Sequence, residues 1–171
     1  PVELDSERTE HAMRRVTRQV AFDGAWTPER KAKVAALFDD MAPEWTANHD
    51  LPNRYQPLVD ALDRGDVHGG RCLELGSGTG LGTRHLQGRF DAVVALDLAA
   101  VMLANAPAVL GARVQADAGE LPFGADSFDV LVLVNALLFP AEIDRVLAPA
   151  GAIVWVNTSA ENTPIHLSPE E

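Results

Sequence analysis

The sequence has few of the residues that mark secreted, metal-binding or nucleic-acid-binding proteins. Its single cysteine, Cys72, excludes an internal disulfide, so we expect a reducing, cytoplasmic compartment. No Cys-x-x-Cys or His-x-x-x-His spacing occurs, and no metal site is predicted. Only 14 basic residues stand against 25 acidic ones, for a net charge of −11. Because phosphate contacts dominate nucleic-acid affinity, we expect no nucleic-acid partner.

Long apolar runs are also missing from the chain. No stretch approaches the ~18 apolar residues of a membrane-spanning helix, so we expect no stable membrane insertion. The length of 171 residues and the hydrophobic content of 47% are typical of one globular domain with a sizeable core.

The hydrophobic period changes at about residue 66. Before that point apolar residues recur at helical spacing, as Val34, Leu37, Phe38 and Met41 do on one face. Residues 1–66 therefore predict an N-terminal helical cap. Its helices are expected over residues 6–20, 28–42 and 54–64.

From residue 67 to residue 171 short apolar strands alternate with short helices. Strands are expected over residues 71–75, 92–97, 112–116, 128–134 and 151–156, and helices over residues 80–88, 99–106 and 141–148. The run 130–134 is apolar throughout, which is typical of parallel strands buried on both faces. We predict an α/β fold with a doubly wound, mostly parallel sheet, whose ligand lies at the carboxyl ends of the strands.

A glycine-rich segment follows the first of these strands. Residues 74–80 read Glu-Leu-Gly-Ser-Gly-Thr-Gly, which predicts a strand, a tight turn and a helix start that exposes N–H donors. A dinucleotide site needs Gly-x-Gly-x-x-Gly, and Leu81 and Thr83 stand where its last glycine would be. An NAD-dependent oxidoreductase is therefore a disfavoured alternative.

This loop resembles the cofactor loop of class I S-adenosylmethionine-dependent methyltransferases, in which an acidic residue precedes Gly-x-Gly-x-Gly. Residues 120–129 resemble the family's Leu-Pro-Phe…Asp-Ser-Phe-Asp stretch, and residues 147–151 resemble its Leu-x-Pro-Gly-Gly turn. Upstream, residues 37–45 resemble its Phe-Asp-x-x-Ala-x-x-Tyr/Trp segment, which implies a helical lid. Together these motifs resemble the small-molecule methyltransferases of that superfamily, with a Rossmann-like core over residues 67–171.

The resemblance implies S-adenosylmethionine as the cofactor. Asp97, 23 residues after Glu74, would accept hydrogen bonds from the ribose hydroxyls, and Asp117 would accept from the adenine amino group. Capping of a helix by Asp97 and a solvated loop position for Asp117 stay open as alternatives. The expected cofactor-binding residues are Trp45, Glu74, Gly76, Ser77, Gly78, Gly80, Asp97, Leu98, Met102, Asp117, Ala118 and Asn135.

No residue pattern identifies a catalytic base. The sulfonium methyl is already activated, so in-line transfer needs alignment more than proton removal. By residue type alone the candidates are Asn135, His49, Tyr55 and His166, and Asn135 can equally cap a strand.

The predicted function is methyl transfer from S-adenosylmethionine to a small-molecule or lipid-like acceptor. A non-catalytic S-adenosylmethionine-binding regulator is the alternative. The acceptor and the oligomeric state are not predicted. The related fold has seven strands, so we expect its last strand pair to lie beyond this chain, with residues 168–171 beginning a helix.

Overall fold

A computed structural model describes residues 12–168 of the chain. The expected helix over residues 6–20 is present from Ala12, and its first residues lie outside the described part. Most of the helix expected at residues 168–171 also lies outside it.

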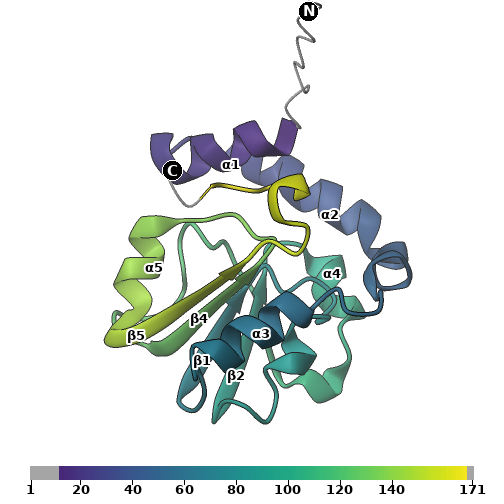
Figure 1. Ribbon diagram of the computed structural model, residues 1–171. Helices are drawn as coiled ribbons and strands as arrows, with labels where there is room; N and C mark the ends of the chain where they lie inside the picture. The colour runs from purple at the N-terminus through teal and green to yellow at the C-terminus, as the bar shows by residue number, and fades with distance from the viewer. Residues whose placement is uncertain (1–11, 169–171) are drawn as a thin grey trace, which may run out of the picture.

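Five parallel strands form one sheet in the order β3-β2-β1-β4-β5 (Figure 1). The strands are β1 (Arg71–Leu75), β2 (Ala92–Asp97), β3 (Ala112–Gln115), β4 (Phe128–Val134) and β5 (Leu147–Val156). In register, Leu73 of β1 lies beside Val94 of β2 and Leu131 of β4. The doubly wound parallel sheet is confirmed, and within residues 12–168 there is no antiparallel strand pair.

Side chains of β1 alternate between two cores, one on each face of the sheet. On one face Cys72 packs with Leu58 and Leu62 of α3 (Gln56–Arg64). On the other face Leu73 packs with Ile143 and Val146 of α5 (Pro140–Val146). Cys72 is a fully buried core thiol.

Two N-terminal helices, α1 (Ala12–Asp23) and α2 (Pro28–His49), lie across the carboxyl ends of the strands (Figure 1). Thr27 caps α2 by accepting the Arg30 N–H at 3.3 Å. Ala42 of α2 packs on Ala99, which directly precedes α4 (Ala100–Asn105), and on Met102 within α4. This packing places α2 above the glycine loop.

Three helix predictions are wrong in extent. The helix expected over residues 80–88 is only the 3-10 turn η1 (Thr83–His85), because Gly80, Gly82 and Gly88 disfavour helix. The helix expected to end at residue 42 continues through Pro43 to His49. The helix expected over residues 141–148 ends at Val146, because Leu147 pairs with Phe128 and begins β5.

Two further 3-10 turns are η2 (Ala108–Leu110) and η3 (Ala160–Asn162). Among the helices of residues 12–168, none combines the length and the apolar character that a membrane crossing requires.

The buried sheet centre should dominate stability. Leu131→Ala, at a residue with 0% exposure, is expected to lower the free energy of unfolding by about 3 kcal/mol through lost burial and a cavity. Ile153→Ala, at a 48% exposed residue of β5, is the matched control and should cost less than about 1 kcal/mol. Urea unfolding measures both, and equal losses would contradict this assignment of the core.

Candidate cofactor site at the glycine loop

The loop after β1 turns on glycines with positive φ: 69° at Gly76, 56° at Gly78 and 83° at Gly80. A Cβ on Gly76 would lie 2.8 Å from the Cβ of Ala136, which follows β4. The loop therefore packs against the segment after β4, at a position that tolerates no side chain. The Ser77 N–H donates to the Leu96 carbonyl at 3.0 Å and ties the loop to β2.

Asp97 ends β2 and holds this loop from the other side. Its Oδ2 accepts the Gly78 N–H at 2.7 Å, and its Oδ1 accepts the Ala99 N–H at 2.9 Å. Burial raises the pKa of the Asp97 carboxyl, and these backbone donors oppose that rise. The bond to Ala99 joins Asp97 to the residue before α4, but the N-cap of α4 is Ala99 itself, so capping by Asp97 is not shown. A carboxylate has further lone pairs, so the ribose contact stays a prediction.

Glu74 lies under the loop, fully enclosed by protein. Thr83 donates its hydroxyl to Glu74 Oε2 at 2.5 Å, and the carboxyl fills the space beside Gly82. Burial raises the pKa of Glu74 to about 8, and the charge of Asp97 adds to the rise. Glu74 is thus predominantly protonated at neutral pH. The structure gives it a role in fixing the turn, and its cofactor contact stays a prediction.

Trp45 of α2 covers the loop from above. A Cβ built on Gly78 would be 3.7 Å from Trp45 Nε1 and 3.9 Å from Met102 Sδ. Trp45 stacks on His49 with ring centroids 3.9 Å apart, and Phe38 meets it edge-on at 5.8 Å. These contacts bring the predicted residues Trp45, Gly78 and Met102 together at one place.

The hydroxyl of Ser77 supports a ligand at this loop. Ser77 is 6% exposed, and its Oγ has no hydrogen-bond partner among residues 12–168. Since buried polar groups are normally bonded, this atom marks a place for a polar ligand group. The missing side chain of Gly78, the carboxylate of Asp97 and this hydroxyl together fit the polar, hydroxyl-bearing cofactor that the resemblance implies.

Asp117, expected at the adenine, is bound by the N-terminal segment. Its Oδ1 accepts Trp26 Nε1 at 2.9 Å and the Gly119 N–H at 2.8 Å, and Lys31 Nζ lies 3.1 Å from Oδ2. Sequence reasoning missed Trp26 and Lys31. The sequence marks them only in that Trp26 directly precedes the Thr27 cap and Lys31 is one of only two lysines in the chain.

Leu98 and Ala118 lie beside these carboxylates. The Leu98 carbonyl accepts Gln115 Nε2 at 3.4 Å, and Ala118 packs against the core on the α5 face. Neither placement tests their predicted contact with a cofactor.

Asn135, directly after β4, has a φ of 52° and bonds twice to Thr158. Its Nδ2 donates to Thr158 Oγ1 at 2.9 Å, and its Oδ1 accepts the Thr158 N–H at 2.9 Å. Asn135 therefore joins the ends of β4 and β5. Positioning of a substrate by Asn135 stays a prediction.

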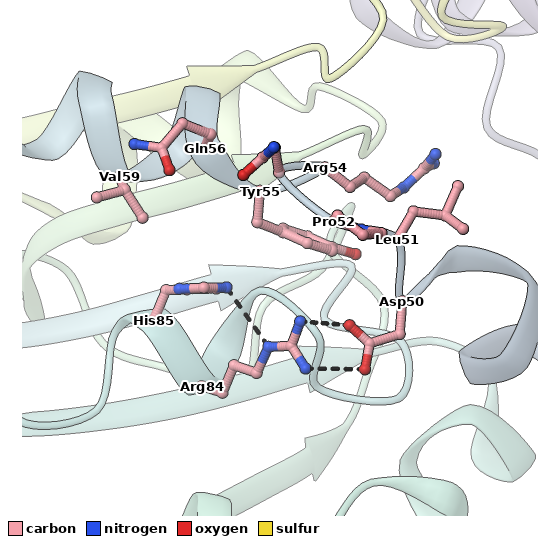
Figure 2. Close-up of a pocket in the computed structure, with 10 residues that line it drawn as sticks. Asp50, Leu51, Pro52, Arg54, Tyr55, Gln56, Val59, Arg84 and His85 are labelled. Atoms are coloured by element: carbon pink, nitrogen blue, oxygen red, sulfur yellow. Dashed lines mark hydrogen bonds and ion pairs between the residues drawn. The ribbon is translucent and has the colours of Figure 1, made fainter.

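The remaining catalytic candidates make contacts with residues other than Asn135. His49 Nδ1 is 2.9 Å from the Trp45 carbonyl, and the His166 N–H bonds to the Thr163 carbonyl. Tyr55 lines a separate cavity of about 410 Å³ beside α3 (Figure 2). Of the residues that the structure describes, no three potential metal ligands lie together.

Figure 2 shows this cavity between the segment 50–56 and η1. Arg84 donates two hydrogen bonds to Asp50, at 3.0 and 2.5 Å. Tyr55 stacks over His85 with the ring centroids 5.8 Å apart. Burial lowers the pKa of His85, and the Arg84 charge adds to that effect. No residue of the glycine loop, 76–80, lines the cavity, so it is distinct from the site above the loop.

Comparisons with known proteins agree with this geometry. The family described as "Methyltransferase domain" matches residues 73–155. The chain is 32% identical over 146 residues to demethylmenaquinone methyltransferase of Renibacterium salmoninarum, covering 74% of this chain and 59% of that protein. It is 39% identical over 119 residues to malonyl-[acyl-carrier protein] O-methyltransferase of Halorhodospira halophila, covering 61% and 40%.

A solved complex of DhpI with SAH has the same fold, with a TM-score of 0.58 and 30% identity. The alignment covers 72% of this chain and 67% of DhpI. Of the two curated methyltransferases named above, by contrast, the chain spans about half the length.

The buried Glu74 carboxyl predicts a pH dependence of stability. Its pKa is raised from 4.5 to about 8, so the folded protein binds a proton that the unfolded chain loses. The contribution of Glu74 to the free energy of unfolding is fully present below pH 4.5. As the pH rises toward 8, the free energy of unfolding falls by up to about 1.4 kcal/mol per pH unit.

Glu74→Gln keeps the acceptor for Thr83 and cannot titrate. Chemical unfolding of both proteins at intervals from pH 5 to pH 8 should show a smaller decline in the variant. Parallel curves would show that Glu74 is ionised in the folded state.

Proposed function

The chain belongs to the class I S-adenosylmethionine-dependent methyltransferases, and from this premise we propose that it transfers a methyl group to a small-molecule, lipid-like or carrier-linked acceptor. The observation that carries the proposal is the site above the glycine loop. There Trp45 packs over Gly78, which has no side chain, the Ser77 hydroxyl is buried without a partner among residues 12–168, and the Asp97 carboxylate lies beside the loop. A polar cofactor satisfies all three features.

Different residues would bind different parts of the cofactor. Asp97 would accept from the ribose hydroxyls and Asp117 from the adenine amino group, while Ser77 and the loop amides would bind the amino-acid end. Trp45 would lie near the sulfonium, where the face of an aromatic ring stabilises positive charge. When bound, the cofactor supplies an already activated methyl group. The remaining task of the protein is alignment, which is worth roughly 7–11 kcal/mol.

We propose an acceptor whose nucleophile is already ionised or strongly activated. Asn135 is engaged with Thr158 through both its amide nitrogen and its amide oxygen, and an amide offers no titratable base. A carboxylate or an electron-rich ring carbon needs no protein base before it attacks. The names of two relatives, a malonyl-[acyl-carrier protein] O-methyltransferase and a demethylmenaquinone methyltransferase, are compatible with such acceptors.

Two buried atoms near the end of β5 support an acceptor site beside Asn135. Trp155 Nε1 and Asn157 Oδ1 have no hydrogen-bond partner within residues 12–168. Because unpaired buried polar atoms are costly, a polar group of the acceptor would satisfy them.

A binding protein without turnover is the second candidate function. The observation that favours it is the same engagement of Asn135, whose amide nitrogen and oxygen are both bonded to Thr158. Cofactor binding without methyl transfer to carboxylate or quinol acceptors would support it. The cytoplasmic location stays a prediction from the single cysteine.

Calorimetric titration with S-adenosylmethionine and S-adenosylhomocysteine tests the proposal. Both should bind, NAD should not, and Asp97→Asn should weaken binding about tenfold through loss of charged hydrogen bonds. Asp126→Asn changes an exposed loop carboxylate at a φ of 55° and is the matched control. Thermal unfolding of each variant confirms that it is folded. NAD binding, or no loss of affinity in Asp97→Asn, would contradict the proposed site.

A further inference from the structure

We propose that Asp117 and the turn between α1 and α2 form a latch that holds α2 closed over the glycine loop and must open before the cofactor binds. This inference rests on the proposed function and concerns the control of the same site. Its elements are Asp117, Trp26 and Lys31.

Trp26 of the turn and Lys31 of the first turn of α2 bind the two oxygens of Asp117. Trp26 Nε1 donates to Oδ1 at 2.9 Å, and Lys31 Nζ lies 3.1 Å from Oδ2. The Asp117 side chain is only 14% exposed, whereas that of Lys31 is 39% exposed. A charge-assisted bond in such a sheltered place is stronger than an exposed ion pair. Trp26 is therefore the main element of the latch, and Lys31 is the lesser one.

The indole of Trp26 also fills the space beside Asp117. It meets the ring of Phe139 edge-on, with centroids 5.3 Å apart and planes at 71°. A Cβ on Gly119 would lie 2.9 Å from Trp26 Cδ1 and 3.1 Å from Phe139. The loop after β3 and the segment after β4 are thus both covered by this one side chain. A ligand that reaches Asp117 has to displace it.

The other end of α2 is fastened separately. Asp50, after the helix, pairs with Arg84, and both side chains are 41% exposed. Between the two ends, the hydroxyls of Thr46 and Thr79 are 2.8 Å apart, and Asp39 accepts the Val101 N–H at 2.8 Å. The helix is held down along its length, and the glycine loop lies beneath it. The cofactor cannot reach the loop while all these contacts persist.

The cofactor and the latch compete for the space beside the Asp117 carboxylate. Asp117 accepts from Trp26, Lys31 and the Gly119 N–H, which leaves about one of its four lone-pair positions, and the Trp26 indole fills the space next to it. When only an opened state binds a ligand, the observed affinity falls with the fraction of protein in that state. Weakening the latch should therefore accelerate binding and tighten it.

Surface plasmon resonance with S-adenosylhomocysteine tests the latch. Trp26→Phe keeps the ring contact with Phe139 and removes the donor, so the association rate constant should rise about tenfold. Lys31→Met should raise it about twofold, as for a partly exposed ion pair. Lys33→Met changes the neighbouring lysine of α2 and should leave it unchanged. Unchanged association in Trp26→Phe and Lys31→Met, or weaker binding in both, would overturn the latch.

Hydrogen exchange without ligand separates failure of the latch from failure of the proposed function. Trp26→Phe should accelerate amide exchange in the first half of α2, and Lys33→Met should not. If Trp26→Phe exchanges faster but neither the wild-type protein nor any variant binds the cofactor, the proposed function is refuted. The conclusion that Trp26 holds the start of α2 closed would still stand. Unchanged exchange in Trp26→Phe would refute the latch itself, whatever the protein binds.

Discussion

The N–H of Gly78 donates to the carboxylate of Asp97, and this bond fixes the position of the glycine loop between β1 and β2. The two ends of the bond come from adjacent parallel strands, so the sheet register determines whether they meet. The same carboxylate accepts the N–H of Ala99, which directly precedes α4, the helix on which α2 packs. One half-buried carboxylate, whose pKa is raised by desolvation, therefore joins the loop to the segment that leads into α4.

Closure of the site follows from this arrangement. Met102 of α4, the helix that follows β2, lies next to Gly78, and Trp45 of α2 packs over the same glycine. The turn before α2 then reaches Asp117, at the end of β3. Carboxyl ends of parallel strands meet at one edge, so a single helix can contact groups from β1, β2 and β3 together. In this fold the proposed cofactor site and the contacts that cover it use the same residues.

Sequence patterns predicted the centre of the sheet well because residues 130–134 are apolar without interruption, which is typical of a parallel strand buried on both faces. They failed where tertiary contacts outweigh local preference. The helix expected over residues 28–42 continues through Pro43 to His49, since Trp45 and Thr46 gain contacts with the loop. The residues near the glycine loop were predictable from their motif. Trp26 and Lys31 were not, because their contacts to Asp117 span 86 residues or more and carry no local signature.

The most direct test of the central claim is a crystal structure of the protein with S-adenosylhomocysteine. We predict that the ligand lies on the glycine loop beneath Trp45, with its ribose hydroxyls bonded to Asp97 and with Trp26 moved away from Asp117. A ligand bound instead in the cavity beside Tyr55 and Arg84, or one that leaves Asp97 without a new partner, would contradict the account.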